Sequence, residues 1–445
     1  MKYGDLIQLP ITDLDKKGRG FGVLDNRRIV VPKTIPGDEV RATFVKRDSG
    51  DRIARLQDIK TASADRVPAP CPHADICGGC LWQHMGYEAQ VKHKGEMINR
   101  AFEQAGHEER VASVEPCAEP FGYRNRMDFV FGPEGQLGLK EYGSWNRYVD
   151  VKTCLLMDKK TDAILDKVKT FAAESGLKPW DARKHEGDLR YCIVRRGVNT
   201  DEHLVMLLVK DLSRVTQHVT HITELLSPLC TTLLLGENPT ITDLSLATTI
   251  VHLSGKPELT EDVNGIRYTI HPNSFFQTNT RMAARLQDAV LSSLSDAKRV
   301  LDLYCGLGFF GIAAAKHGAQ VYGHELDAPA IELAWINAER NGVADRCEFA
   351  AGPVEKLDWK EKQPDAVIID PPRAGLHPKA LEALLDNAPP KIVYVSCNYH
   401  RLAEELKVLK TKYRVERLQA FDLFPHTPHV EVIATLSVIP SGAAA

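Results

Sequence analysis

The chain has 445 residues, more than one ordinary hydrophobic core accommodates, so we expect two to four domains. Apolar residues make up 43% and charged residues 26% of the chain, the proportions of a water-soluble globular protein. Its apolar runs, such as residues 204–209, are too short to cross a bilayer, which excludes a membrane-spanning protein. The first residues contain no basic stretch followed by an apolar one, so we expect no secretory signal and a cytoplasmic location.

Charge is nearly balanced overall but uneven along the chain. The 56 Lys and Arg against 59 Asp and Glu give a net charge of −3, which argues against a protein that coats nucleic acid. Residues 1–60, however, contain 13 basic and 9 acidic residues, so this end carries +4 and the remainder −7. A local excess of basic residues favours contact with the phosphates of a nucleic acid.

Residues 1–58 alternate apolar and polar positions in short runs, which turn signals such as Gly18-Arg19-Gly20 separate. This pattern predicts a small antiparallel barrel of the oligonucleotide-binding (OB-like) type. The local positive charge favours RNA binding by this barrel, although a barrel can also serve only to pack against other domains. The runs are residues 6–9, 22–24, 28–31 and 39–45.

Three cysteines cluster after a Pro-rich join at residues 67–72. Five residues separate Cys71 from Cys77, and two separate Cys77 from Cys80. The intervening Gly78-Gly79 allows a tight loop on which thiolates can converge. Without an export signal, such a cluster indicates a metal site rather than disulfides. A zinc site and an iron-sulfur cluster both need a fourth ligand, and the spacing does not decide between them.

The segment 59–271 mixes strand-like and helix-like runs, which predicts an α+β central domain. It also contains Cys117, Cys154 and Cys192, each a candidate for the fourth ligand. Packing inside a core is the ordinary role of a lone cysteine and is the alternative for all three. The strand-like runs are 127–131, 204–209 and 266–270, and the helix-like runs are 162–175 and 218–226.

From residue 272 to residue 445 the pattern becomes regular. An amphipathic helix at 280–294 is followed by strands that alternate with helices, which predicts a mostly parallel, doubly wound, Rossmann-like sheet. Ligands of such sheets bind at the carboxyl ends of the strands, so the residues that follow each strand are the candidates for chemistry. The expected strands are 300–303, 320–323, 366–369 and 392–395.

The first of these strands ends in a glycine-rich turn at residues 304–308, and a helix containing 312–316 follows. Glycines allow the backbone to approach a ligand closely at the start of a helix. Glu325, which ends the next strand about 20 residues later, is placed to accept hydrogen bonds from ribose hydroxyls. The pattern suits either a dinucleotide or S-adenosylmethionine, and a solvated glutamate at a helix start is the alternative.

Asp370 follows the third strand and precedes Pro371-Pro372. The two prolines disfavour a helix and fix a rigid turn, which projects Asp370 into the crevice above the cofactor. Methyltransferases that act on nucleic-acid bases carry a similar acidic or amide residue before two prolines, so this turn favours S-adenosylmethionine. A purely structural Pro-Pro turn is the alternative.

Cys397 follows the fourth strand at the same edge and is either a packing residue or a nucleophile. Carbon 5 of uracil is a poor nucleophile, and a thiolate that adds to carbon 6 activates it toward a sulfonium methyl group. A base must then remove the carbon 5 proton so that the thiolate can leave. Glu431, at the start of a strand, is our first candidate for this base, and His426 and His429 are the rivals.

Phe275 and Gln277 lie in the join between the central and C-terminal segments. A base that is flipped out of an RNA needs an aromatic ring for stacking and an amide that reads its edge, and these two side chains can supply both. The alternative is a core phenylalanine and a capping residue before the helix that starts at Thr280.

Taken together, these residues resemble the RNA 5-methyluridine methyltransferases with an N-terminal TRAM domain, and especially the branch that modifies 23S ribosomal RNA. The resemblance covers nearly the whole chain and includes the stretches 123–126 and 143–154. It implies a cytoplasmic, monomeric enzyme without membrane contact that takes part in RNA modification and rRNA processing. Its reaction would be transfer of a methyl group from S-adenosyl-L-methionine to carbon 5 of a uridine in structured RNA, through a covalent adduct between a cysteine and carbon 6.

The resemblance also implies domains, cofactors and residue roles. A TRAM barrel is implied for residues 1–58, a central α+β domain with a four-iron four-sulfur (4Fe-4S) cluster for 59–271, and a Rossmann-like methyltransferase domain for 272–445. The implied residues are Cys71, Cys77, Cys80 and Cys154 for the metal cluster, Gln277, Tyr304, Glu325 and Asp370 for S-adenosylmethionine, Cys397 as the nucleophile and Glu431 as the proton acceptor.

Two residues depart from the pattern of the family. Tyr399 stands where a proline typically follows Ser-Cys-Asn, and Phe309 stands where an asparagine often contacts the cofactor. Neither departure removes a reacting group. The alternative functions are methylation of a transfer RNA uridine, methylation of an exocyclic base nitrogen, which needs Asp370 but no thiolate, and RNA binding by an iron-sulfur protein whose methyltransferase domain is vestigial.

Overall fold

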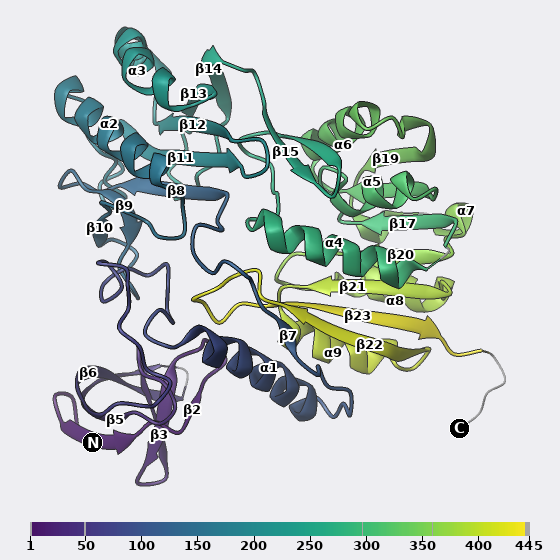
Figure 1. The fold of residues 1–445 in the computed structure, drawn as a ribbon, viewed down its shortest axis with the longest axis horizontal. Coiled ribbons are helices and arrows are strands. Elements are labelled where there is room, and N and C mark those ends of the chain that lie inside the picture. Colours follow the sequence, from purple (N-terminus) through teal and green to yellow (C-terminus); the bar gives the residue numbers. More distant parts are fainter. Residues whose placement is uncertain (1, 49, 296, 358, 441–445) are drawn as a thin grey trace.

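The computed structural model describes residues 2–48, 50–295, 297–357 and 359–440. Within these residues the strands form three large sheets and one two-stranded sheet, which follow one another along the sequence except for one strand, β7 (Figure 1). The N-terminal sheet and the central sheet lie on one side of the molecule, and the C-terminal sheet lies on the other. None of the helices in the described part of the chain combines the length and the hydropathy needed to span a bilayer.

The described residues between 6 and 61 form a six-stranded sheet in the order β1-β5-β6-β4-β3-β2. Neighbouring strands are antiparallel except for β4 and β6, which run parallel. Alternate apolar side chains, such as Ile29, Val31 and Val40, form a small separate core, as a period of two requires. The sequence predicted four of these strands and missed β2 and β6. The strands are β1 (Leu6–Pro10), β2 (Asp13–Leu14), β3 (Gly20–Leu24), β4 (Arg27–Val31), β5 (Glu39–Asp48) and β6 (Asp51–Thr61).

A seven-stranded sheet, in the order β10-β9-β8-β11-β12-β13-β14, occupies the centre of the chain. Every residue of β12 is buried, because β11 and β13 flank it and helix α2 packs on the same core. The mixture of strands and helices predicted for this segment is therefore confirmed. The elements are β8 (Arg126–Phe131), β9 (Leu137–Lys140), β10 (Tyr148–Asp150), α2 (Lys159–Ser175), β11 (Leu189–Gly197), β12 (Glu202–Val209), η1 (Leu212–Arg214), η2 (Thr216–His218), α3 (Val219–Leu226), η3 (Ser227–Leu229), β13 (Thr232–Glu237) and β14 (Thr249–Gly255), followed by the hairpin of β15 (Leu259–Val263) and β16 (Ile266–Ile270).

The C-terminal sheet has the strand order β19-β18-β17-β20-β21-β23-β22-β7. The first five strands in this order, from β19 to β21, run parallel to one another. Strand β23 pairs antiparallel to β21. Side chains of β20 alternate between two cores, with Ile368 in the first and Val367 and Ile369 in the second, because helices cover both faces of the sheet. This is the predicted doubly wound architecture. The elements are α4 (Thr280–Leu294), β17 (Arg299–Leu303), α5 (Phe309–Lys316), β18 (Gln320–Glu325), α6 (Ala328–Arg340), η4 (Ala344–Arg346), β19 (Cys347–Ala351), η5 (Val354–Lys356), α7 (Trp359–Lys362), β20 (Ala366–Ile369), α8 (Pro378–Asn387), β21 (Lys391–Ser396), α9 (Tyr399–Leu409), β22 (Tyr413–Phe421) and β23 (Glu431–Val438).

Helix α1 (Tyr87–Gln104) and strand β7 (Val114–Glu115) precede the central sheet in sequence but pack with the C-terminal one. Strand β7 extends the edge of that sheet beside β22, and Ile98 and Phe102 of α1 share a core with Leu402 and Leu406 of α9. The sequence did not predict this arrangement. The segment 59–271, predicted as one central domain, therefore contributes to both the central sheet and the C-terminal sheet.

Candidate active site

The carboxyl ends of four parallel strands meet at one edge of the C-terminal sheet. Leu303 of β17 pairs with His324 of β18 and with Ile369 of β20, and Ile369 pairs in turn with Tyr394 of β21. The residues that leave these strands therefore gather at that edge, which is where open parallel sheets bind ligands. They are Tyr304, Glu325, Asp370 and Cys397.

The turn after β17 is shaped to receive a ligand. Tyr304 has φ +62, a conformation that few non-glycine residues adopt, and its backbone N–H donates to His324 O at 2.8 Å. A Cβ placed on Gly306, where φ is +53, would meet no atom within 4 Å, so the space beside this residue is open. The backbone N–H of Gly306 donates to Glu325 Oε2 at 3.2 Å, which fixes the carboxylate next to that space.

A second carboxylate lies buried under the same turn. Asp302 is 1% exposed, and its Oδ2 accepts a hydrogen bond from Gly311 N at 2.8 Å. Its Oδ1 has no hydrogen-bond partner among the described residues. Burial raises the pKa of Asp302 to about 8. A buried acceptor without a partner is unusual in a folded protein and points to a ligand with hydrogen-bond donors.

Gln277 and Asp370 lie together, as two residues assigned to one cofactor should. The Nε2 of Gln277 donates to Asp370 Oδ2 at 3.4 Å, and the Gln277 carbonyl accepts from Asn125 Nδ2 at 2.8 Å. Desolvation raises the pKa of Asp370 to about 7. The long contact leaves this carboxylate free to accept a stronger bond from a ligand.

Cys397 and Glu431 face each other across two antiparallel strands. The last pair of the β21–β23 ladder joins Ser396 to Val432. Cys397 directly follows Ser396, and Glu431 directly precedes Val432 as the first residue of β23. Glu431 is 4% exposed, and burial raises its pKa well above the usual range, with a contribution from the charge of Asp370. Burial and the charge of Glu431 raise the pKa of the Cys397 thiol to about 11.

Arg373 opposes both of these shifts and was not singled out in the sequence. Its guanidinium lowers the pKa of Cys397 and of Glu431, though by less than burial raises them. Its carbonyl accepts a hydrogen bond from Asn398 Nδ2 at 2.9 Å, which joins the loop after β20 to the start of α9. The signal that could have identified Arg373 is its place directly after the Asp370-Pro371-Pro372 turn.

The two histidines proposed as rival bases occupy different surroundings. His426 is buried, stacks on Phe121 with ring centroids 4.2 Å apart, and contacts Gln90 Nε2 through Nδ1 at 3.2 Å. These contacts account for His426 as a packing residue, and burial lowers its pKa to about 4. His429 is exposed and lines a cavity of about 370 Å³ beside Cys397, together with Lys16 and Lys17.

The structure separates the two adjacent phenylalanines of the join. Phe275 is 69% exposed, so its ring is accessible for stacking, whereas Phe276 is buried against Tyr268 and Phe309. Phe309 therefore stands in an aromatic cluster, and its departure from the family pattern has a packing reason. Tyr399 is also buried, at the first turn of α9.

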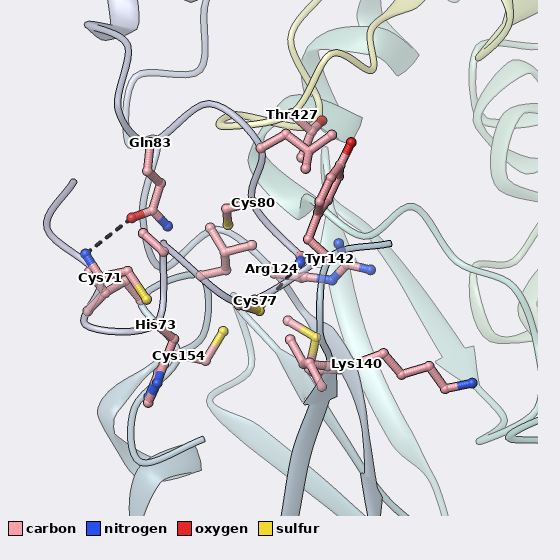
Figure 2. A pocket seen from close by; sticks show the side chains of 18 of the residues that line it. Cys71, His73, Cys77, Cys80, Gln83, Arg124, Lys140, Tyr142, Cys154 and Thr427 are labelled. Atoms are coloured by element: carbon pink, nitrogen blue, oxygen red, sulfur yellow. Dashed lines mark hydrogen bonds between the residues drawn. The ribbon is translucent and has the colours of Figure 1, made fainter. Parts of the chain in front are cut away.

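The four cysteines assigned to a cluster line one cavity of about 630 Å³, and Figure 2 shows them gathered around it. All four are free thiols, whereas Cys117 and Cys192 lie buried in the hydrophobic core. Burial, together with the neighbouring thiols, raises the pKa of Cys80 to about 12 and that of Cys154 to about 11. Among the described residues, no group of three or more His, Cys, Asp or Glu is arranged to hold a metal ion, so the metal assignment rests on the donor set alone. The four are Cys71, Cys77, Cys80 and Cys154.

The cavity of the cysteines adjoins the cavity beside Cys397. Leu81, Arg373, Pro428 and His429 line both of them. The loop between β22 and β23, which supplies Pro428 and His429, also receives two hydrogen bonds at the carbonyl of His426, from Leu81 N and Trp82 N at 3.0 Å each. The loop of the cysteines is therefore attached directly to the loop that precedes Glu431.

Comparisons with known proteins agree with this geometry. The family described as tRNA (Uracil-5-)-methyltransferase matches residues 256–438. The chain is 36% identical over 421 residues to the tRNA (uracil(54)-C(5))-methyltransferase of Pyrococcus horikoshii, covering 94% of this chain and 97% of that one. It is also 36% identical over 419 residues to the enzyme of the same name from Pyrococcus abyssi, with coverages of 94% and 97%. A solved structure of the Pyrococcus abyssi tRNA (uracil-54, C5)-methyltransferase in complex with S-adenosyl-L-homocysteine matches with a TM-score of 0.83 and 34% identity, over 96% of this chain and 99% of that one.

Proposed function

The chain belongs to the tRNA (uracil-5-)-methyltransferase family and is an RNA uracil-C5 methyltransferase that uses S-adenosylmethionine, and on this basis we propose that its substrate is uridine 54 of transfer RNA. The observation that carries the proposal is the near full-length correspondence to enzymes named for that nucleotide. The sequence motifs favoured 23S ribosomal RNA, and the relatives support the transfer RNA alternative better.

We propose that Gln277, Tyr304, Glu325 and Asp370 hold S-adenosylmethionine, which supplies the methyl group when it is bound. Three features of the site support this fit. The space beside Gly306 is open, the carboxylate of Glu325 is fixed next to it, and a buried oxygen of Asp302 has no partner among the described residues. Carboxylates suit the ribose hydroxyls and the ammonium group of this ligand, because both are hydrogen-bond donors.

We propose that Cys397 releases its proton to solvent and that the thiolate then adds to carbon 6 of the uracil. The electron pair of the double bond between carbons 5 and 6 shifts away from carbon 6, which makes carbon 5 nucleophilic enough to take the methyl group. The carboxylate of Glu431 then accepts the proton of carbon 5. The electrons of that C–H bond restore the double bond between carbons 5 and 6, and the thiolate leaves. Two observations support this role: burial raises the pKa of Glu431, which increases its affinity for a proton, and Glu431 lies beside Cys397 in the register of β21 and β23.

The test of the proposed substrate is methylation of defined RNAs by the purified protein with labelled S-adenosylmethionine. We expect 5-methyluridine at position 54 of an unmodified transfer RNA transcript and no label in a transcript in which cytidine replaces uridine 54. Methylation of ribosomal RNA fragments without methylation of the transfer RNA would contradict the proposal. Label on an exocyclic nitrogen would contradict the role of Cys397.

We propose further that the N-terminal sheet is a TRAM-type RNA-binding domain and that the four cysteines hold a 4Fe-4S cluster. Four free thiols around one cavity match the cysteine donor set of such a cluster. Protein purified without oxygen should be brown, with about four iron and four sulfide per chain. Cys154→Ser should lower the iron content, while Cys192→Ser, at a core cysteine, should leave it unchanged. A colourless protein that contains zinc would contradict the cluster.

A further inference from the structure

A turn of the N-terminal sheet reaches the active site. Residues 15–19 connect β2 to β3, and within this turn Lys16 and Lys17 line the cavity of about 370 Å³ that Cys397 also lines. Both lysines are exposed. A wall of the catalytic cavity therefore comes from the N-terminal sheet, which is far from Cys397 in sequence.

The carboxylate of Asp15 fixes the backbone of the turn. Its Oδ1 accepts hydrogen bonds from Lys17 N at 2.9 Å and from Arg19 N at 2.8 Å, and its Oδ2 accepts from Arg19 Nε at 2.7 Å. Asp15 itself is 4% exposed. The positions of the two lysines are thus set by a buried group, and only their side chains remain free to adapt to a ligand.

Gly18 attaches the turn to the loop that precedes Glu431. Its φ is +73, and a Cβ at this position would lie 2.5 Å from the Cβ of Pro428 and 2.9 Å from the Trp82 ring, so the contact admits no side chain. The Gly18 carbonyl accepts a hydrogen bond from Trp82 Nε1 at 2.7 Å. The turn is therefore held against the catalytic loop rather than merely near it.

The two lysines differ from the other cations in their surroundings. A cavity of about 780 Å³ adjoins the first and shares Lys16, Lys17, Tyr399 and His400 with it. The arginines that line this second cavity already have acidic partners. Lys16 and Lys17 have no side-chain hydrogen bond or ion pair with any residue in the part of the chain that the structure describes, so their charges are available to an anion. The arginine pairs are Arg19–Asp15, Arg28–Asp51 and Arg100–Asp13.

We propose that Lys16 and Lys17 bind the phosphates that flank the target uridine and so clamp the RNA strand at the mouth of the catalytic cavity. The proposal rests on the proposed function, because it takes the nucleotide beside Cys397 to be the target. Arg373 lines the same cavity, so a strand that enters it meets cations from both the N-terminal and the C-terminal parts of the chain. RNA binding by the N-terminal sheet then positions the reacting nucleotide as well as adding affinity.

The first test is the salt dependence of binding to a transfer RNA transcript. Lys16→Ala/Lys17→Ala removes two phosphate contacts, so the slope of log K against log salt should become shallower by about 1.4, since each contact to a single strand contributes about 0.7. KM for the RNA should rise, with kcat, S-adenosylmethionine affinity and melting temperature unchanged. Lys159→Ala/Lys160→Ala is the matched control, because this adjacent pair at the start of α2 lines neither cavity.

The second test places the contact on the RNA. A neutral methylphosphonate at a linkage beside the methylated uridine should weaken binding to the wild-type protein and to the Lys159/Lys160 control, and it should have no further effect on the Lys16/Lys17 variant. An equal loss in all three proteins, or an unchanged salt slope in the Lys16/Lys17 variant, would overturn the proposal. The salt slope and the methylphosphonate effect are both measured by binding, so a wild-type protein that binds transfer RNA without methylating it would contradict the substrate assignment and not the clamp.

Discussion

At the scale of single residues, the reaction depends on one half-buried group, Cys397, and one buried group, Glu431, whose protons must move. The thiol of Cys397 and the carboxyl of Glu431 both have raised pKa values, because burial disfavours their charged forms. The sequence singled out Cys397 by its place at the exit of a parallel strand, and it singled out Glu431 as a carboxylate at the start of a later strand that could act as the base. It missed Arg373, Lys16 and Lys17, because a cavity wall assembled from distant segments leaves no local pattern.

Glu431→Gln should separate the two halves of the reaction. The amide cannot accept the carbon 5 proton, so methyl transfer should proceed while the cysteine adduct persists. A denaturing gel should then show a covalent complex between the protein and transfer RNA that the wild type does not accumulate. Glu416→Gln, at an exposed glutamate on the neighbouring β22, should show no such complex. If Glu431→Gln released free product at the wild-type rate, another group would be the base.

The reactivity of Cys397 should depend steeply on pH. Its pKa of about 11 means that the thiolate fraction rises about tenfold per pH unit across the neutral range. Alkylation of Cys397 in the RNA-free protein, followed by mass spectrometry between about pH 6 and pH 9, should therefore accelerate throughout. Arg373→Ala removes a positive charge that lowers this pKa, so alkylation should be slower at each pH. An alkylation rate that does not change with pH would show that the Cys397 thiol is not protonated in this range.

At the scale of elements, local periodicity predicted what depends on local contacts. The residues of α4, β16 and β20 match the expected runs, because each is a single amphipathic or buried segment. The pairing of Val114 in β7 with Ala420 in β22, and the packing of α1 on α9, join segments that lie about 300 residues apart. No periodicity within either segment contains that information.

One buried ion pair fixes this long-range junction. Lys94 of α1 and Asp422, just after β22, are both fully buried, and Lys94 Nζ donates to Asp422 Oδ1 at 2.5 Å and to the Phe424 carbonyl at 3.0 Å. The hydroxyl of Tyr87 donates to Asp422 Oδ2 at 2.9 Å. The pair ties α1 to the start of the loop that leads to Glu431.

Lys94→Met should therefore destabilise the protein strongly, because it leaves the Asp422 carboxylate buried without its cation. Breaking such a pair costs about 3 to 5 kcal/mol of unfolding free energy. Lys92→Met, at an exposed lysine on the same helix, should change it by less than about 0.5 kcal/mol. Denaturant unfolding of both variants measures the difference. Equal stability of the two variants would show that the junction does not depend on the pair.

At the scale of the whole molecule, the C-terminal sheet, the loop of the cysteines and the N-terminal sheet contribute to one region. The C-terminal sheet supplies Cys397 and Glu431, the loop of the cysteines attaches to the segment before Glu431, and the N-terminal sheet supplies Lys16 and Lys17 to the cavity that Cys397 lines. The sequence predicted three successive units. It did not predict that their loops contact one another. Such contacts depend on the surfaces of the folded units, and the hydrophobic pattern within each unit does not specify them.

The central claim is a transient bond between the sulfur of Cys397 and carbon 6 of the target uridine. Transfer RNA with 5-fluorouridine at position 54 should trap it, because after methyl transfer carbon 5 carries fluorine and no proton that a base can remove. With S-adenosylmethionine present, mass spectrometry of the digested complex should find the methylated nucleotide on the peptide that contains Cys397. Methylated RNA with no protein adduct, or an adduct on another cysteine, would contradict the account.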